Sequence, residues 1–150
     1  MEQFVDVMQF DLPIRSKDIH AEGQIASMTD CLLRNANDHI ICFDDIYGGT
    51  HRYFRNCIVN YNIETSFVDC TDGELIEKSI KPNTKLFWIE TPSNPLMKIV
   101  DLESICNLRD RKAPEALIVV DNTFMSPVFQ NPLKFGVDLV VHSLTKYVNG

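Results

Sequence analysis

Short apolar runs alternate along this chain with segments whose apolar residues recur at helical spacing. The first clear run, His39 to Phe43, is almost continuously apolar and ends at Asp44 and Asp45. A strand that is buried on both faces of a sheet has this pattern. Similar runs predict four further strands, at residues 64–68, 85–89, 117–120 and 138–142.

Helical spacing fills the intervals between these runs. Helices are predicted at residues 23–34, from Thr50 as N-cap to about Val59, at 72–80, and at 101–111 with Asp101 as N-cap. The alternation predicts an α/β domain with a mainly parallel sheet of about five strands and helices on both faces. Residues 1–22 show no clear period, so we expect an irregular arm there and the domain at 23–150.

Charge and cysteine content narrow the possible functions. The net charge of −7, from 14 basic and 21 acidic residues, argues against nucleic acid and against anionic membrane surfaces as partners. We see neither a membrane-spanning run nor a secretory signal in the sequence. The five cysteines form no C-x-x-C pair and lie mostly in apolar segments. We therefore expect reduced cysteines and a cytoplasmic protein.

Polar side chains collect where the predicted strands end. They are Asp44, Asp45 and Tyr47; Glu90 and Asn94; Asp121 and Thr123; and Ser143, Thr145 and Lys146. Ligands of open α/β sheets bind outside the carboxyl ends of the strands, so these groups predict a site. Helix caps and turns would explain some of them. A nucleotide-binding or phosphoacceptor domain is an alternative, although no G-x-G-x-x-G or Walker-type loop is present.

Four stretches carry a resemblance to a known family. They are Asp44 to Phe54 (DDIYGGTHRYF), Trp88 to Pro95 (WIETPSNP), Val120 to Pro127 (VDNTFMSP) with Phe129 to Leu133 (FQNPL), and His142 to Gly150 (HSLTKYVNG). In this order they resemble the pyridoxal-phosphate-dependent enzymes of cysteine and methionine metabolism, which have the fold-type-I (aminotransferase-like) large domain. The resemblance covers about residues 23–150.

The resemblance implies pyridoxal 5′-phosphate as cofactor and three catalytic residues. Lys146 would hold the cofactor as a Schiff base and then carry protons. Asp121 would pair with the protonated ring nitrogen, which keeps the ring able to accept electrons. Tyr47 would lie flat on the cofactor ring.

The remaining cofactor contacts are implied in the same way. Ser143 and Thr145 would donate hydroxyl hydrogen bonds to the phosphate, and the backbone amides of Gly23 and Gln24 would add to them. Asn94 and Thr123 match positions beside the phenolic oxygen of the ring and beside Asp121. The resemblance implies no metal.

The activity implied is that of a carbon–sulfur lyase of transsulfuration, acting on a cystathionine-like amino acid in a homotetramer. Sister enzymes of the family share the same stretches and are alternatives. Gly150 lies four residues beyond Lys146, whereas the family continues further. We therefore expect the chain to correspond to a central part of the large domain. An inert fragment that at most associates with full-length subunits is a further alternative.

Overall fold

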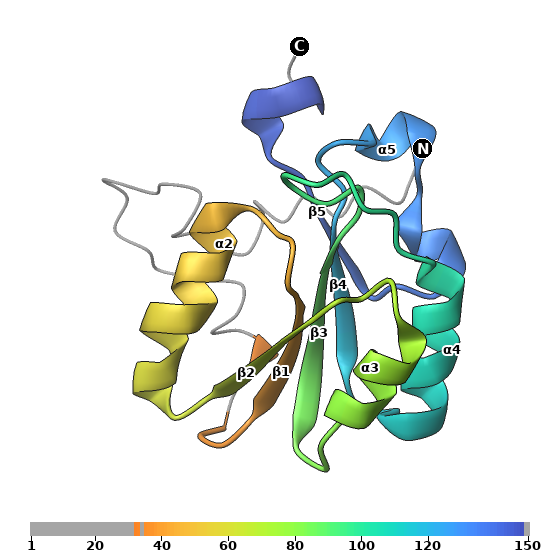
Figure 1. The fold of residues 1–150 in the computed structure, drawn as a ribbon. Helices are drawn as coiled ribbons and strands as arrows, with labels where there is room; N and C mark the ends of the chain where they lie inside the picture. Colours follow the sequence, from red (N-terminus) through yellow and green to blue (C-terminus); the bar gives the residue numbers. More distant parts are fainter. Residues whose placement is uncertain (1–31, 34, 149–150) are drawn as a thin grey trace.

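Five parallel strands form one sheet in the order β2-β1-β3-β4-β5 (Figure 1). The computed structural model describes residues 32, 33 and 35–148. The strands are β1 (His39–Phe43), β2 (Glu64–Val68), β3 (Thr84–Glu90), β4 (Leu117–Asp121) and β5 (Leu139–Val141). The predicted α/β class and parallel sheet are confirmed.

The core lies around the middle strands because these are covered on both faces. All of β1 and nearly all of β3 are buried, as their continuous apolar runs predicted. Trp88 on β3 is fully buried and meets the ring of Phe54 edge to face, with ring centroids 5.3 Å apart. This contact fixes the helical segment after β1 against the sheet.

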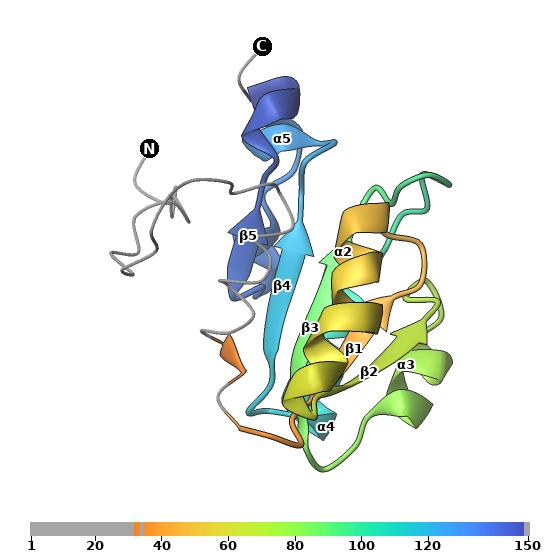
Figure 2. The ribbon, with the colours of Figure 1, turned by 90° about the vertical axis from the view of Figure 1, so that its left-hand side faces the viewer.

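Helices cover both faces of the sheet (Figures 1 and 2). One face carries α2 (Gly48–Arg52), which continues as a π-helical turn (Tyr53–Cys57) and a 3-10 turn (Ile58–Tyr61). The other face carries α3 (Gly73–Ser79) and α4 (Leu102–Lys112). The right-handed crossovers expected of parallel strands place the helices in this way.

One of the two predicted helix caps is confirmed. Asp101 accepts a hydrogen bond from the backbone nitrogen of Ser104 at the start of α4. Asp72, where we predicted only the start of a helix, accepts hydrogen bonds from two amides of the first turn of α3. Thr50 was wrongly predicted as a cap. The helix begins at Gly48, and Thr50 lies inside it with its hydroxyl buried and without a partner in the described part of the chain.

Short helical turns occupy the loops after β4 and β5, where we predicted none. They are α5 (Ser126–Phe129), a 3-10 turn (Pro132–Phe135) and a π-helical turn (Leu144–Val148). The predicted arm at 1–22 and almost all of the predicted helix at 23–34 lie outside the described residues. No described helix has the length and apolar content needed to cross a membrane.

The described cysteines are free thiols, as expected. Cys42, Cys70 and Cys106 are buried, whereas Cys57 is exposed on the helical segment after β1. Burial raises the pKa of the Cys42 thiol well above its usual value and that of Cys106 above it. The three buried thiols are therefore unreactive packing groups.

Candidate functional site

The carboxyl ends of β3, β4 and β5 meet at one edge of the sheet. In the strand register Glu90 lies opposite Asp121, and Asp121 lies opposite Val141. The loops that follow these strands gather at the upper end of the molecule in Figure 1. This is the edge at which the sequence predicted a site.

A chain of hydrogen bonds joins the loop after β4 to the loop after β5. Oδ1 of Asp121 accepts from the backbone nitrogen of Thr123 at 3.0 Å and from its hydroxyl at 2.5 Å. The same hydroxyl accepts from the backbone nitrogen of Ser143 at 2.8 Å. The hydroxyls of Ser143 and Thr145 are 3.1 Å apart. Four predicted site residues are thus brought together.

Asp121 is a carboxyl group with one unused oxygen. Burial raises its pKa above the usual value, although the hydrogen bonds from Thr123 and the neighbouring His142 act in the opposite direction. No described residue donates a hydrogen bond to its second oxygen. A cationic partner placed there would offset the cost of burying the charge, so the group suits a protonated ring nitrogen.

Tyr47 enters the site from the loop between β1 and α2. Its backbone nitrogen donates to Oε2 of Glu90 at 2.8 Å, and its side chain is 44% exposed. A Cβ atom at Gly49 would lie 2.4 Å from Cε1 of the Tyr47 ring. Only glycine therefore lets the ring rest on the first turn of α2 in this way.

Glu90 is one of the polar strand-end residues that predicted the site, but no role was predicted for it; it links Tyr47 to the strand that pairs with β4. It is 5% exposed. Burial and the nearby carboxylates of Asp121 and Asp45 raise its pKa to about 8, against the opposing hydrogen bond from Tyr47. The signal in the sequence is an acid that closes an otherwise apolar strand. Its contact with Tyr47, 43 positions away, was not readable there.

Asn94 lies in the loop after β3, and Asp45 holds this loop in place. Asp45 accepts from the Ser93 hydroxyl and, at 3.0 Å, from the backbone nitrogen of Leu96. The Ser93 oxygen accepts in turn from the backbone nitrogen of Lys98 at 2.8 Å. Asn94 itself is half-buried and hydrogen-bonds to none of the predicted site residues that the structure describes.

Lys146 lies beside the hydroxyl pair, but its side chain is exposed. Its backbone nitrogen donates to the carbonyl oxygen of Ser143 at 3.1 Å. The side-chain amine makes no hydrogen bond or ion pair with any described residue. Gly23 and Gln24, predicted to contact the phosphate, lie outside the described residues.

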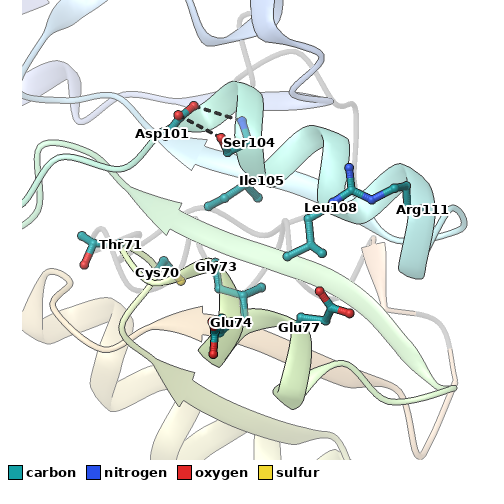
Figure 3. A pocket seen from close by; sticks show the side chains of 11 residues that line it. Cys70, Thr71, Gly73, Glu74, Glu77, Asp101, Ser104, Ile105, Leu108 and Arg111 are labelled. Carbon is teal, nitrogen blue, oxygen red and sulfur yellow. Dashed lines mark hydrogen bonds between the residues drawn. The ribbon is translucent and has the colours of Figure 1, made fainter.

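A groove elsewhere on the molecule contains none of the predicted site residues. It runs between α3 and α4 (Figure 3) and is lined by polar residues and apolar ones, among them Cys70, Glu74, Glu77, Ser104 and Arg111. Several of the polar groups around it are paired within the fold, as in the bonds from Ser104 to Asp101 and the contact of Glu77 with Lys112.

The donor set at the carboxyl edge fits pyridoxal phosphate. Asp121 offers a free carboxylate oxygen for a cationic ring nitrogen, and the Ser143 and Thr145 hydroxyls offer donors to an anionic group. Tyr47 offers a partly exposed aromatic side chain, and Lys146 an exposed amine. The fold and this edge define an α/β domain of the pyridoxal-phosphate-dependent class.

Comparison with known proteins gives the family. The model of the Cys/Met metabolism PLP-dependent enzymes matches residues 19–150. The chain belongs to this family, and pyridoxal phosphate is the cofactor of the family.

Individual relatives agree with this assignment. A putative cystathionine gamma-lyase 2 from Caenorhabditis elegans is 47% identical and matches 97% of this chain and 38% of its own. Human cystathionine gamma-lyase is 49% identical over 87% of this chain and 32% of its own. A probable cystathionine gamma-synthase from Herpetosiphon aurantiacus is 43% identical over 88% of this chain and 41% of its own.

A solved structure gives the same result for the fold. The crystal structure of metB from Corynebacterium glutamicum matches with a TM-score of 0.79 and 40% identity. The match covers 84% of this chain and 32% of that one. The chain thus spans about a third of the length of the relatives it matches.

Proposed function

We propose that this chain carries the cofactor-binding part of a carbon–sulfur lyase of the cystathionine gamma-lyase type. Such an enzyme converts cystathionine to cysteine, 2-oxobutanoate and ammonia. The observation that carries the proposal is the connected set of Asp121, Thr123, Ser143 and Thr145 beside Lys146. The names of the relatives at 47% and 49% identity support the lyase reaction.

Each residue has a physical role in this proposal. When bound, pyridoxal phosphate supplies a ring that accepts electrons from a carbanion. Asp121 holds the proton on the ring nitrogen, and Thr123 keeps that carboxylate in place. Ser143 and Thr145 bind the phosphate, and Lys146 holds the cofactor and moves protons between substrate carbons. Tyr47 covers the ring, and Asn94 contacts the ring oxygen from the loop after β3. Gly23 and Gln24 complete the phosphate site.

Other reactions of the family are second candidates. The 43% identity to a probable cystathionine gamma-synthase favours that enzyme as the first of them, ahead of a beta-lyase or methionine gamma-lyase. We further propose a homotetramer in the cytoplasm, the latter because the buried cysteines are unpaired thiols.

Covalent labelling tests the proposed cofactor site. The purified chain is incubated with pyridoxal phosphate and reduced with borohydride, and the labelled peptide is found by mass. We expect label on Lys146 alone, lost in Lys146→Arg and kept in Lys134→Arg, which changes another exposed lysine. Label scattered over several lysines would overturn the proposal.

Turnover separates the lyase from an inert chain. The exposure of Lys146, whose amine has no described partner, favours the alternative in which the 150-residue chain is catalytically inert and at most associates with full-length subunits. The unmodified chain and the Lys134→Arg control are assayed with cystathionine, and with methionine as the competing substrate. Release of 2-oxobutanoate from cystathionine supports the lyase. Specific labelling without turnover supports the inert alternative.

A further inference from the structure

Glu90 lies at a position where a carboxyl group destabilises the fold. It closes the central strand β3, is 5% exposed, and faces two other acids, Asp121 from the end of β4 and Asp45 from the end of β1. The thiol of Cys42 on β1 also lies within its electrostatic reach. No described cation pairs with it. A carboxyl group in such surroundings costs stability that a leucine would not cost.

The contact that Glu90 makes is specific. The one described donor to its carboxyl group is the backbone nitrogen of Tyr47, at 2.8 Å. That nitrogen belongs to the residue just before α2, whose side chain makes no capping bond. Glu90 therefore fixes the chain at the point where the Tyr47 side chain leaves it.

The Tyr47 ring lies against the first turn of α2. Tyr47 is 44% exposed, and a Cβ atom at Gly49 would lie 2.4 Å from Cε1 of the ring and 3.2 Å from Cδ1 and Cζ. Gly49 thus leaves room for this part of the ring. The ring can keep this place only while the Tyr47 backbone, which the bond to Glu90 holds, keeps its own.

We propose that Glu90 is the positioning residue for Tyr47: its buried carboxyl group holds the Tyr47 amide and so keeps the aromatic ring in place against Gly49. Glu90 acts through Tyr47 and does not touch the cofactor. The expected effect on cofactor affinity rests on the proposed function, whereas the position of the Tyr47 ring does not depend on it. The near-neutral pKa of Glu90 supports this role, because a protonated carboxyl group can still accept the amide hydrogen bond.

Two substitutions of similar volume separate this role from mere packing. Glu90→Gln keeps an oxygen that accepts from the Tyr47 amide, and Glu90→Leu keeps the volume without an acceptor. NMR on the chain without cofactor gives two readouts: hydrogen exchange at the Tyr47 amide, and the ring-current shift of the Gly49 α-protons. We expect both to be preserved in Glu90→Gln. In Glu90→Leu, exchange should be at least about tenfold faster and the Gly49 shift should be lost.

The unmodified chain itself can overturn the proposal. If its Tyr47 amide exchanges at the rate of an unstructured peptide, the hydrogen bond from this amide to Glu90 does not exist. This result does not depend on whether any variant folds. Equal Gly49 shifts in Glu90→Leu and Glu90→Gln would also overturn it.

A double-mutant cycle on pyridoxal phosphate affinity then tests the consequence. Glu90→Leu should weaken binding as much as Tyr47→Ala does, and the combined variant should show no further loss. Additive losses contradict action through Tyr47. Absence of any binding by the unmodified chain counts against the proposed function, and the NMR result on Tyr47 stands apart from it.

Discussion

At the scale of single residues, His39 shows how the sheet sets a protonation state. Its ring is fully buried, and its two nitrogens lie 2.8 Å from the Thr84 hydroxyl and 2.9 Å from the Ser66 hydroxyl. These contacts tie β1 to β3 and to β2. Burial, with help from nearby Lys81 and against Glu64, lowers the pKa of His39 from 6.5 to about 4.

Stability should therefore fall in mild acid. The unfolded chain binds a proton at His39 below pH 6.5, whereas the folded chain does so only near pH 4. The contribution of His39 is complete above pH 6.5 and is lost as the pH falls towards 4, by up to about 3 kcal/mol. We expect the difference in unfolding free energy between the unmodified chain and His39→Gln to shrink over this range. A constant difference from pH 7 to pH 4 would contradict the neutral ring.

Glu90 should produce the opposite slope. Its pKa is about 8 in the fold and 4.5 in the unfolded chain, so the folded state holds a proton that the unfolded state has released. The contribution is complete below pH 4.5 and is lost as the pH rises through 8, by up to about 5 kcal/mol. Urea unfolding at pH 6 and pH 9 checks this. Glu90→Gln should gain stability relative to the unmodified chain at the higher pH, and an unchanged difference would contradict it.

At the scale of elements, Arg109 on α4 anchors the turn that leads into β5. Its guanidinium donates to the carbonyl oxygens of Ala116 and Gly136, both at 3.0 Å, and to Asp138 at 2.7 Å. The same Asp138 oxygen accepts from the backbone nitrogen of Ile118 on β4 at 2.7 Å. Arg109 is 8% exposed, so these bonds are largely removed from water.

Loss of this anchor should be costly. Arg109→Met removes the guanidinium from a carboxylate and from two carbonyl oxygens, which we expect to cost about 3 kcal/mol of unfolding free energy. Arg111→Met, on the exposed side of the same helix, is the matched control and should change it by less than about 0.5 kcal/mol. Fluorescence of Trp88, the one tryptophan of the chain, reports both unfolding curves. Equal effects in the two variants would show that Arg109 is not an anchor.

Some kinds of element were predictable from the sequence and others were not. Strands β1 and β3 were readable because full burial demands continuous apolar residues. The hydroxyls and acids at the strand ends were readable because parallel strands bring their carboxyl ends together. The prediction of Thr50 as an N-cap was wrong, because a threonine before a helical pattern is typical of a cap whether its hydroxyl faces the helix amides or the core. The bond between Glu90 and Tyr47 joins distant positions, and local patterns carry no information about it.

At the scale of the whole molecule, exposed apolar side chains gather towards the edge that carries the site. They lie on the loops after β3, β4 and β5, namely Leu96, Met97, Ile99, Val128, Phe129, Leu144, Tyr147 and Val148. Val128 is 83% exposed and Phe129 79%. An apolar surface of this kind favours association.

Self-association of the purified chain should therefore depend on this end of the molecule. We expect sedimentation velocity to show concentration-dependent assembly, reduced by Val128→Ser with Phe129→Ser. The control is Val59→Ser with Tyr61→Ser, which changes two exposed apolar residues on the helical segment after β1. Reduction by both pairs alike would mean that association is not specific to the site edge.

The strand order has a consequence for how the chain acquires its shape. β1 pairs with both β2 and β3, whereas β5 has three residues and, among the strands of residues 35–148, pairs with β4 alone. Parallel pairing must bring together distant parts of the chain, so the richly paired centre forms at a lower entropic cost than the short outer strand. The edge that carries Ser143 and Thr145 is thus the last part to assemble and the first to open. A small molecule bound across the ends of β4 and β5 would stabilise the pairing of these two strands. It would thus support folding as well as take part in a reaction.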